Sequence, residues 1–188
     1  MTYLHNAFPM PSNPLSRAHF CGGCFWCVQA AFANLRGVSS ATSGYLGGAS
    51  ANPTYDQVCS GRTGHIEAVE IAYDPAVIPY GVLLDVFFAV HDPTTRDRQG
   101  ADAGTQYRSA IFGTDADLAA AKARIAQLEK DGVFGAPIVT ELRPLAPFYP
   151  AETYHQDYYA NNAEAPYCRA VINPKLKKVR EGFAGWLK

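Results

Sequence analysis

The chain has 188 residues, 48% of them hydrophobic, and a formal net charge of −1 at pH 7. This length and composition predict one domain, residues 1–188, with a sizeable core. Because there is no block of basic residues, neither nucleic acid nor an anionic membrane surface is expected as the main partner. We expect a monomer.

The first 16 residues are expected to form an N-terminal extension. Three prolines lie there among polar residues, and no apolar segment has the length that a signal peptide needs. No later segment is long and apolar enough to suggest a membrane span. The default expectation is a cytoplasmic location. In such a reducing compartment, five irregularly spaced cysteines indicate redox or catalytic thiols rather than a disulfide framework.

The first predicted unit is a strand, a glycine turn and a helix. Residues 17–20 have the pattern of a short strand, Gly22 and Gly23 follow, and residues 28–35 have helical composition and spacing. Cys24 therefore lies at or near the N-terminus of the helix, where unpaired N–H groups and the helix dipole favour an anion. This position predicts a depressed pKa, which makes Cys24 a candidate nucleophile.

Other uses of these cysteines compete with that interpretation. A buried structural role is the usual one for a single thiol. The spacing of Cys21, Cys24 and Cys27 also resembles a ferredoxin cluster motif, but Ala31 and Phe32 replace its fourth Cys and its Pro. Zinc is disfavoured because there is no second Cys-x2-Cys pair, so no metal is expected. Residues 24–27 form a C-x-x-C pair, which leaves a thioredoxin-like disulfide oxidoreductase open.

A candidate acid follows in the next predicted strands. Residues 38–45 are expected to form a strand, and residues 49–64 a loop whose length usually indicates function. Residues 65–73 alternate as a strand and place Glu67 on the same face as Val69 and Ile71. Burial there would raise the pKa of Glu67 toward that of a general acid, whereas at the open end of the sheet this side chain would be solvated. The pattern alone favours neither.

The remaining segments are predicted to be mainly scaffold. The expected elements are an apolar helix at 79–90, a loop at 91–104, a strand at 109–112, a helix at 115–130 capped by Thr114 or Asp115, and a strand at 137–142. The region after residue 148 is rich in tyrosines, which most often cover the edge of a core. Cys168 lies near its end.

Five motifs, in order along the chain, resemble the peptide methionine sulfoxide reductase A family. They are Gly23-Cys24-Phe25-Trp26, residues 55–69, residues 91–94, residues 102–109 and residues 148–156. The resemblance covers residues 20–178. It implies thiol-dependent reduction of the S epimer of methionine sulfoxide, free or in proteins, with thioredoxin as the reductant and no bound cofactor.

The resemblance also implies roles for individual residues. Cys24 would attack the sulfoxide sulfur and Glu67 would donate the proton, a division of labour that suits an electrophilic sulfur with a poor leaving group. Phe25 and Trp26 would hold the S-methyl group. Tyr55 and Tyr107 would bind the oxygen, and Asp102 would bind substrate and organise the site.

A second thiol is expected to condense with the sulfenic acid left on Cys24. Cys168 is the preferred candidate, because we expect it on a flexible segment that can approach Cys24. Cys27 is the alternative: it is one helical turn away and would have to unwind part of that turn. Cys21 and Cys59 are expected to be non-essential.

The expected fold is mixed α/β, with a largely antiparallel central sheet, packed helices, a ferredoxin-like core and long loops. The order strand-helix-strand-strand-helix-strand between residues 17 and 112 supports it. A thioredoxin-like oxidoreductase remains the alternative, although it leaves Glu67 and both tyrosines unexplained. A non-catalytic redox sensor or metal-binding module is the third interpretation.

Overall fold

The computed structural model describes residues 14–188, and its centre is a six-stranded sheet of order β7-β6-β1-β3-β2-β8. The strands of the sheet and two of the helices that connect them are, in chain order, β1 (Ser16–Gly22), α1 (Phe25–Ala33), β2 (Val38–Leu46), β3 (Ile66–Tyr73), α3 (Tyr80–Val90), β6 (Ser109–Gly113), β7 (Glu141–Pro144) and β8 (Phe148–Pro150). All neighbouring strands are antiparallel except β6 and β7. The order β6-β1-β3-β2 is that of a ferredoxin-like core, which confirms the predicted fold.

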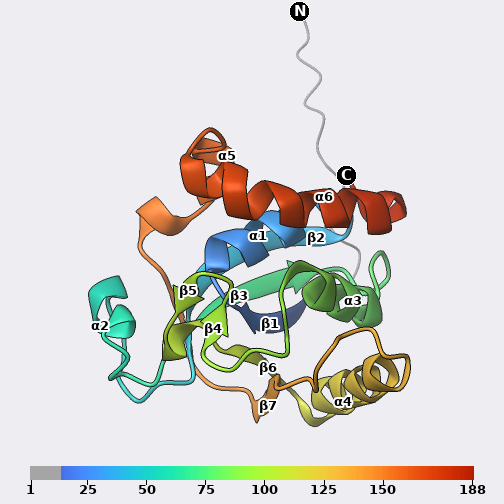
Figure 1. Cartoon of the computed structure of the whole chain (residues 1–188), viewed down its shortest axis with the longest axis horizontal. Helices are drawn as coiled ribbons and strands as arrows, with labels where there is room; N and C mark the ends of the chain where they lie inside the picture. The colour runs from blue at the N-terminus through green and yellow to red at the C-terminus, as the bar shows by residue number, and fades with distance from the viewer. Residues whose placement is uncertain (1–13) are drawn as a thin grey trace, which may run out of the picture.

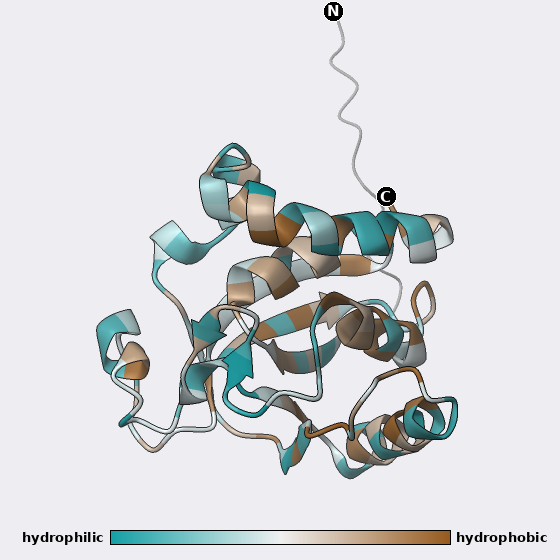
Figure 2. Cartoon of the chain, viewed as in Figure 1, coloured by the Kyte–Doolittle hydropathy of each residue, from teal (hydrophilic) through white to brown (hydrophobic). Residues whose placement is uncertain are grey.

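One face of the sheet carries the main core. Phe20 of β1 stacks on Phe32 of α1 and Phe87 of α3, with ring centroids 5.4 and 4.9 Å apart. The helix α6 (Asn173–Gly182) packs on α1 and α3, which lie on this face (Figure 1). In Figure 2 hydrophobic residues gather in α1, α3 and the strands beneath α6, whereas α6 itself carries many hydrophilic residues. Burial of this apolar surface is the main stabilising contribution to the fold.

The opposite face of the sheet is buried as well. Leu46, Ile66 and Phe112 form a second cluster there, and Phe148 packs against it. Because β3 lies between β1 and β2 and is covered on both faces, seven of its eight residues are buried. This placement leaves no solvated position for Glu67, which is 2% exposed.

Several predicted elements have the expected bounds. Helix α4 (Asp115–Lys130) begins after Thr114, whose side chain accepts a hydrogen bond from the Asp117 N–H in a capping box. Strand β1 begins at Ser16, the last residue of the expected N-terminal extension, and residues 1–13 lie outside the described part of the chain.

The loops contain more structure than predicted. Residues 49–64 include the short helix α2 (Tyr55–Cys59), and residues 91–104 include the paired strands β4 (Arg98–Gln99) and β5 (Asp102–Ala103). The strand predicted at residues 137–142 begins only at Glu141, because its pairing with β6 starts at that residue.

The last forty residues are mostly helical, which the sequence analysis missed. They form α5 (Tyr158–Asn161), a π-helical segment (Cys168–Ile172), α6, and the short 3-10 helix Ala184–Trp186. Two further 3-10 helices, Thr105–Tyr107 and Thr153–His155, precede them. Pro174 occupies the first turn of α6, where a missing N–H costs no intrahelical bond.

Candidate active site

Cys24 occupies the N-cap position of α1, as predicted. Its backbone angles, φ −54° and ψ 121°, lie outside the helix, and its side chain is 7% exposed. The preceding Gly23 has φ +84°, and a Cβ there would lie 2.5 Å from Cγ of Gln99. Only glycine fits both the positive φ and this close approach, so the turn places the thiol at the end of the helix.

Glu67 lies on β3 beside the first residue of α1. Its Oε2 accepts a hydrogen bond from the backbone N–H of Phe25 at 3.0 Å. Burial raises the pKa of Glu67 to about 8; the Phe25 N–H opposes this shift, and the charges of Asp102 and Cys27 add to it. The carboxyl group is therefore mostly protonated at neutral pH and can donate a proton.

The thiols of Cys24 and Cys27 interact directly, and this overturns the expected pKa of Cys24. A hydrogen bond with Cys27, burial and the charge of Glu67 raise the pKa of Cys24 well above its usual value, so the prediction of a depressed value was wrong. The same hydrogen bond, opposed by burial and aided by Lys175 and Tyr167, lowers the pKa of Cys27 to about 7. The pair thus sheds its first proton near neutral pH and holds its second tightly.

Cys24 is the more accessible of these two thiols. Cys27 is fully buried, whereas Cys24 keeps a small exposed surface. A single thiolate shared by the pair is therefore available to an incoming substrate at Cys24.

The two predicted oxygen-binding tyrosines come from short helices. Tyr55 is the first residue of α2, which Thr54 begins with a capping box, and Tyr107 ends the 3-10 helix Thr105–Tyr107. Burial raises the pKa of both phenols, and the charge of Glu67 raises each further. Both hydroxyls are therefore neutral hydrogen-bond donors near Glu67.

Asp102 is tied to the C-terminal segment. Its Oδ2 accepts a hydrogen bond from the hydroxyl of Tyr167 at 2.7 Å, and that hydroxyl lies 3.9 Å from Sγ of Cys27. Tyr167 thus links a carboxylate to the thiol pair. Sequence analysis did not single out this residue, although its neighbour Cys168 had drawn attention to the segment.

Phe25 and Trp26 differ in their surroundings. Phe25 is 1% exposed, whereas Trp26 is half-buried and stacks on Tyr158 with ring centroids 3.7 Å apart. Tyr167 meets the indole edge-on at 5.9 Å. The C-terminal tyrosines therefore surround Trp26, a role that their sequence spacing alone did not indicate.

Cys168 is not on a flexible segment. It is the first residue of the π-helical segment and is fully buried in the main core. Burial raises the pKa of its thiol, and the charge of Cys27 adds to this shift, so Cys168 lies near Cys27. The premise that favoured Cys168 over Cys27 was wrong, because α6 and the core fix this part of the chain.

The remaining cysteines lie on either side of this group. Cys21 is buried in the second cluster, and burial raises the pKa of its thiol. Cys59 is half-buried in α2, where it hydrogen-bonds the Tyr55 side chain. All five thiols are free in this structure.

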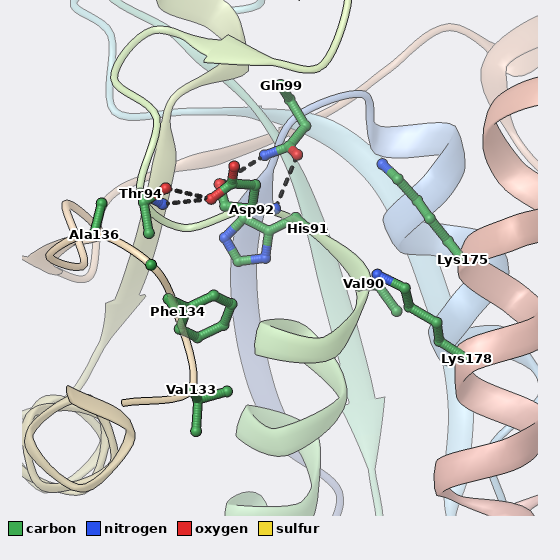
Figure 3. Close-up of a pocket in the computed structure, with 11 residues that line it drawn as sticks. Val90, His91, Asp92, Thr94, Gln99, Val133, Phe134, Ala136, Lys175 and Lys178 are labelled. Atoms are coloured by element: carbon green, nitrogen blue, oxygen red, sulfur yellow. Dashed lines mark hydrogen bonds between the residues drawn. The ribbon is translucent and has the colours of Figure 1, made fainter. Parts of the chain in front are cut away.

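A cavity of about 550 Å³ lies next to the thiol turn, between the end of α3, α6 and residues 133–136. Lys175 and Lys178 extend into it from α6, and the Gln99 side chain bonds the backbone of Asp92 on its other side (Figure 3). Its lining includes neither Cys24 nor Glu67. Lys175 and Gln99 therefore lie between this cavity and the thiol turn, outside the proposed substrate pocket.

The described residues contain no cluster of three or more His, Cys, Asp or Glu side chains suited to a metal ion. None of their helices is long and apolar enough to cross a bilayer.

A ferredoxin-like sheet that buries an N-cap cysteine beside a protonated carboxyl group defines a thiol-dependent reductase. A sequence model of the family described as peptide methionine sulfoxide reductase matches residues 16–185. The chain belongs to this family. Because the chain belongs to this family, the reductase interpretation is preferred over the thioredoxin-like disulfide oxidoreductase.

Individual relatives support the assignment. The chain is 54% identical over 175 residues to peptide methionine sulfoxide reductase MsrA of Chromobacterium violaceum, covering 93% of this chain and 99% of that protein. It is 51% identical to MsrA of Deinococcus radiodurans, covering 95% and 87% of the two chains.

Solved structures share the fold. Reduced Mxr1 from Saccharomyces cerevisiae superposes with a TM-score of 0.73 at 34% identity, over 82% of this chain and 90% of Mxr1. Methionine sulfoxide reductase A of Corynebacterium diphtheriae gives a TM-score of 0.72 at 33% identity, over 84% and 81%. Mxr1 in complex with Trx2 gives 0.51 at 25% identity, over 82% and 91%.

Proposed function

We propose that this protein reduces the S epimer of methionine sulfoxide, free or in proteins, and that thioredoxin returns it to the reduced state. The observation that supports this most is the juxtaposition of a thiol pair with a thiolate near neutral pH and a buried, protonated Glu67. A sulfoxide needs a soft nucleophile at sulfur and a proton at oxygen, and these groups provide both.

In the first step the Cys24 thiolate attacks the sulfoxide sulfur and Glu67 gives its proton to the oxygen. Attack forms a bond between Sγ of Cys24 and the substrate sulfur. As this bond and the S–O bond break, the protonated oxygen passes to Sγ of Cys24 and two electrons pass from Cys24 to the substrate sulfur. The products are methionine, which carries the reduced sulfur, and a Cys24 sulfenic acid. Glu67 regains a proton from solvent before the next cycle.

Tyr55 and Tyr107 act on the oxygen as negative charge grows there. Both are neutral donors close to Glu67, and preorganised donors of this kind stabilise a developing oxyanion. Phe25 and Trp26 provide an apolar wall for the S-methyl group. Asp102 organises this wall through Tyr167, whose ring edge contacts Trp26.

In the second step a thiol condenses with the sulfenic acid and water leaves. Cys27 is the better first partner, because Cys24 is an N-cap residue outside the helix and the Cys27 N–H donates to the Cys24 carbonyl at 3.1 Å. A turn of this type brings two Cα atoms within about 7 Å, close to the range of disulfides, so the helix need not unwind. Cys168, on the π-helical segment that contacts α1, can then receive the disulfide by exchange.

Thioredoxin as the reductant is supported by the complex of the related Mxr1 with Trx2. The test is thioredoxin-coupled turnover with peptides that carry each separate epimer of methionine sulfoxide. We expect turnover with the S epimer only. Equal turnover of both epimers, or of neither, would contradict the proposal.

A further inference from the structure

Two residues that take no part in the chemistry above connect opposite walls of the proposed pocket. Glu152 follows β8, and His155 ends the 3-10 helix Thr153–His155. The Glu152 side chain is one-third exposed, whereas His155 is 2% exposed among aromatic rings. Each makes a hydrogen bond to the segment that carries a proposed substrate-binding residue.

Glu152 holds the start of α2. Its Oε1 accepts the backbone N–H of Tyr55 at 2.8 Å, and its Oε2 accepts the hydroxyl of Tyr45 at 2.7 Å. Tyr45 is fully buried in β2, directly opposite Glu67 in the sheet. Because a five-residue helix has little stability of its own, this link to the sheet fixes where Tyr55 lies.

His155 holds Trp26. The indole Nε1–H donates to Nδ1 of His155 at 3.2 Å. Since an indole nitrogen can only donate, Nδ1 carries no proton and the ring proton lies on Nε2, which is 4.0 Å from Oε2 of Glu152. Burial lowers the pKa of His155, so the ring stays neutral and keeps its acceptor.

The imidazole ring also fills the space between the two walls. Its centroid lies 4.5 Å from that of Tyr55 and 5.0 Å from that of Phe25. A side chain of another shape at this position would change the distance between the oxygen-binding and methyl-binding groups.

We propose that Glu152 and His155 are positioning residues: Glu152 sets Tyr55 through its main chain, and His155 sets the indole of Trp26. The two sides of the sulfoxide pocket are thereby held at a constant separation. This inference rests on the proposed function, in which Tyr55 binds the oxygen and Trp26 contacts the methyl group.

The first test replaces His155. His155→Phe keeps an aromatic ring and removes the acceptor, whereas His155→Asn retains an acceptor near Nδ1. We expect KM for an S-sulfoxide peptide to rise about tenfold in His155→Phe, with a much smaller change in the saturating single-turnover rate, and to recover largely in His155→Asn. In a Trp26→Phe background, which lacks the donor, His155→Phe should add no further rise.

The second test replaces Glu152. In Glu152→Gln the side chain keeps one acceptor oxygen for two donors, the Tyr55 N–H and the Tyr45 hydroxyl. We therefore expect the single-turnover rate to fall about tenfold. In a Tyr55→Phe background the same change should have little additional effect, because there is no hydroxyl left to misplace. Glu70→Gln is the matched control: this carboxylate also accepts two hydrogen bonds, from the side chains of Arg17 and His19, but lies away from the pocket, so KM and the rate should be unchanged in this variant.

A spectroscopic test is independent of activity. The chain has two tryptophans, and Trp186 provides the reference. The indole ¹H–¹⁵N resonance of Trp26 should shift in His155→Phe and return toward its original position in His155→Asn, while that of Trp186 stays constant. If the wild type is active but the effects are additive in both double-mutant cycles, the positioning roles are overturned and the proposed function stands. A wild type that reduces neither epimer would instead overturn the proposed function, even with the resonance shift present.

Discussion

The backbone N–H of Phe25 donates a hydrogen bond to Oε2 of Glu67, which joins the residue after the nucleophile to the second residue of β3. This bond opposes the effect of burial, yet the pKa of Glu67 still rises to about 8. The sheet therefore holds a proton donor beside the thiol turn, and α1 and β3 cannot move apart without exposing it.

Cys24→Ser is expected to abolish sulfoxide reduction. A serine hydroxyl at the N-cap is not ionised near neutral pH and is a much poorer nucleophile toward sulfur than a thiolate. The measurement is methionine released in a single turnover from an S-sulfoxide peptide. Activity above a small fraction of wild type would contradict the role of Cys24, and circular dichroism would show whether the variant keeps its fold.

Glu67→Gln is expected to lower the rate of sulfenic acid formation by about 100-fold or more, with nearly unchanged substrate binding. The amide can still accept from the Phe25 N–H and can donate a hydrogen bond, but it cannot transfer a proton. Rapid-quench kinetics at pH 7 would measure the rate. An unchanged single-turnover rate would show that another group supplies the proton.

The pH dependence of the single-turnover rate should be bell-shaped. The rate should rise as the thiol pair loses its first proton near pH 7 and fall as Glu67 loses its proton near pH 8. In Glu67→Gln the falling limb should disappear while the rising limb remains. A falling limb that persists in this variant would assign it to a different group.

Glu67 should also make stability depend on pH. Its pKa rises from 4.5 to about 8 on folding, so the native state binds a proton more tightly than the unfolded state. The stabilisation from this proton is complete below pH 4.5 and is lost as the pH rises toward 8. Urea unfolding between pH 5 and 9 should show Glu67→Gln gaining stability relative to wild type as the pH rises; a difference independent of pH would contradict this.

The alternation of strands and helices was predictable because it depends on local periodicity. Position 24 as an N-cap and the strand that carries Glu67 follow from the Gly-Gly turn and from two-residue alternation. The burial of Glu67 was not predictable, since it depends on the cover of both faces of β3 by segments distant in sequence.

Long-range contacts account for most of what was missed. Trp26 and His155 are 129 positions apart in the sequence, and no local pattern shows that they share a hydrogen bond. A depressed pKa was expected for Cys24 because only its position at the helix end was taken into account. The neighbouring thiol, burial and Glu67, which raise this pKa, depend on the tertiary structure. Cys168 was expected on a flexible segment because no helix was predicted after residue 148, whereas the structure has the π-helical segment and α6 there.

The thiol that first resolves the sulfenic acid can be identified by two variants. Cys27→Ser and Cys168→Ser should both release one methionine per enzyme in a single turnover, because the bonds of that step are made and broken at Cys24. The release should be slower in Cys27→Ser, which lacks the thiol pair that loses a proton near pH 7. Cys27→Ser should lose thioredoxin-driven turnover, with partial rescue by dithiothreitol, since the backbone bond from the Cys27 N–H to the Cys24 carbonyl holds these two residues one turn apart. Cys168→Ser should keep substantial turnover, because Cys168 acts only by later exchange.

Peptide mapping of wild type after one equivalent of sulfoxide should find a Cys24–Cys27 disulfide. A direct Cys24–Cys168 pair, together with an inactive Cys168→Ser, would show that the buried helical segment opens during the cycle and would reverse the order of the two thiols.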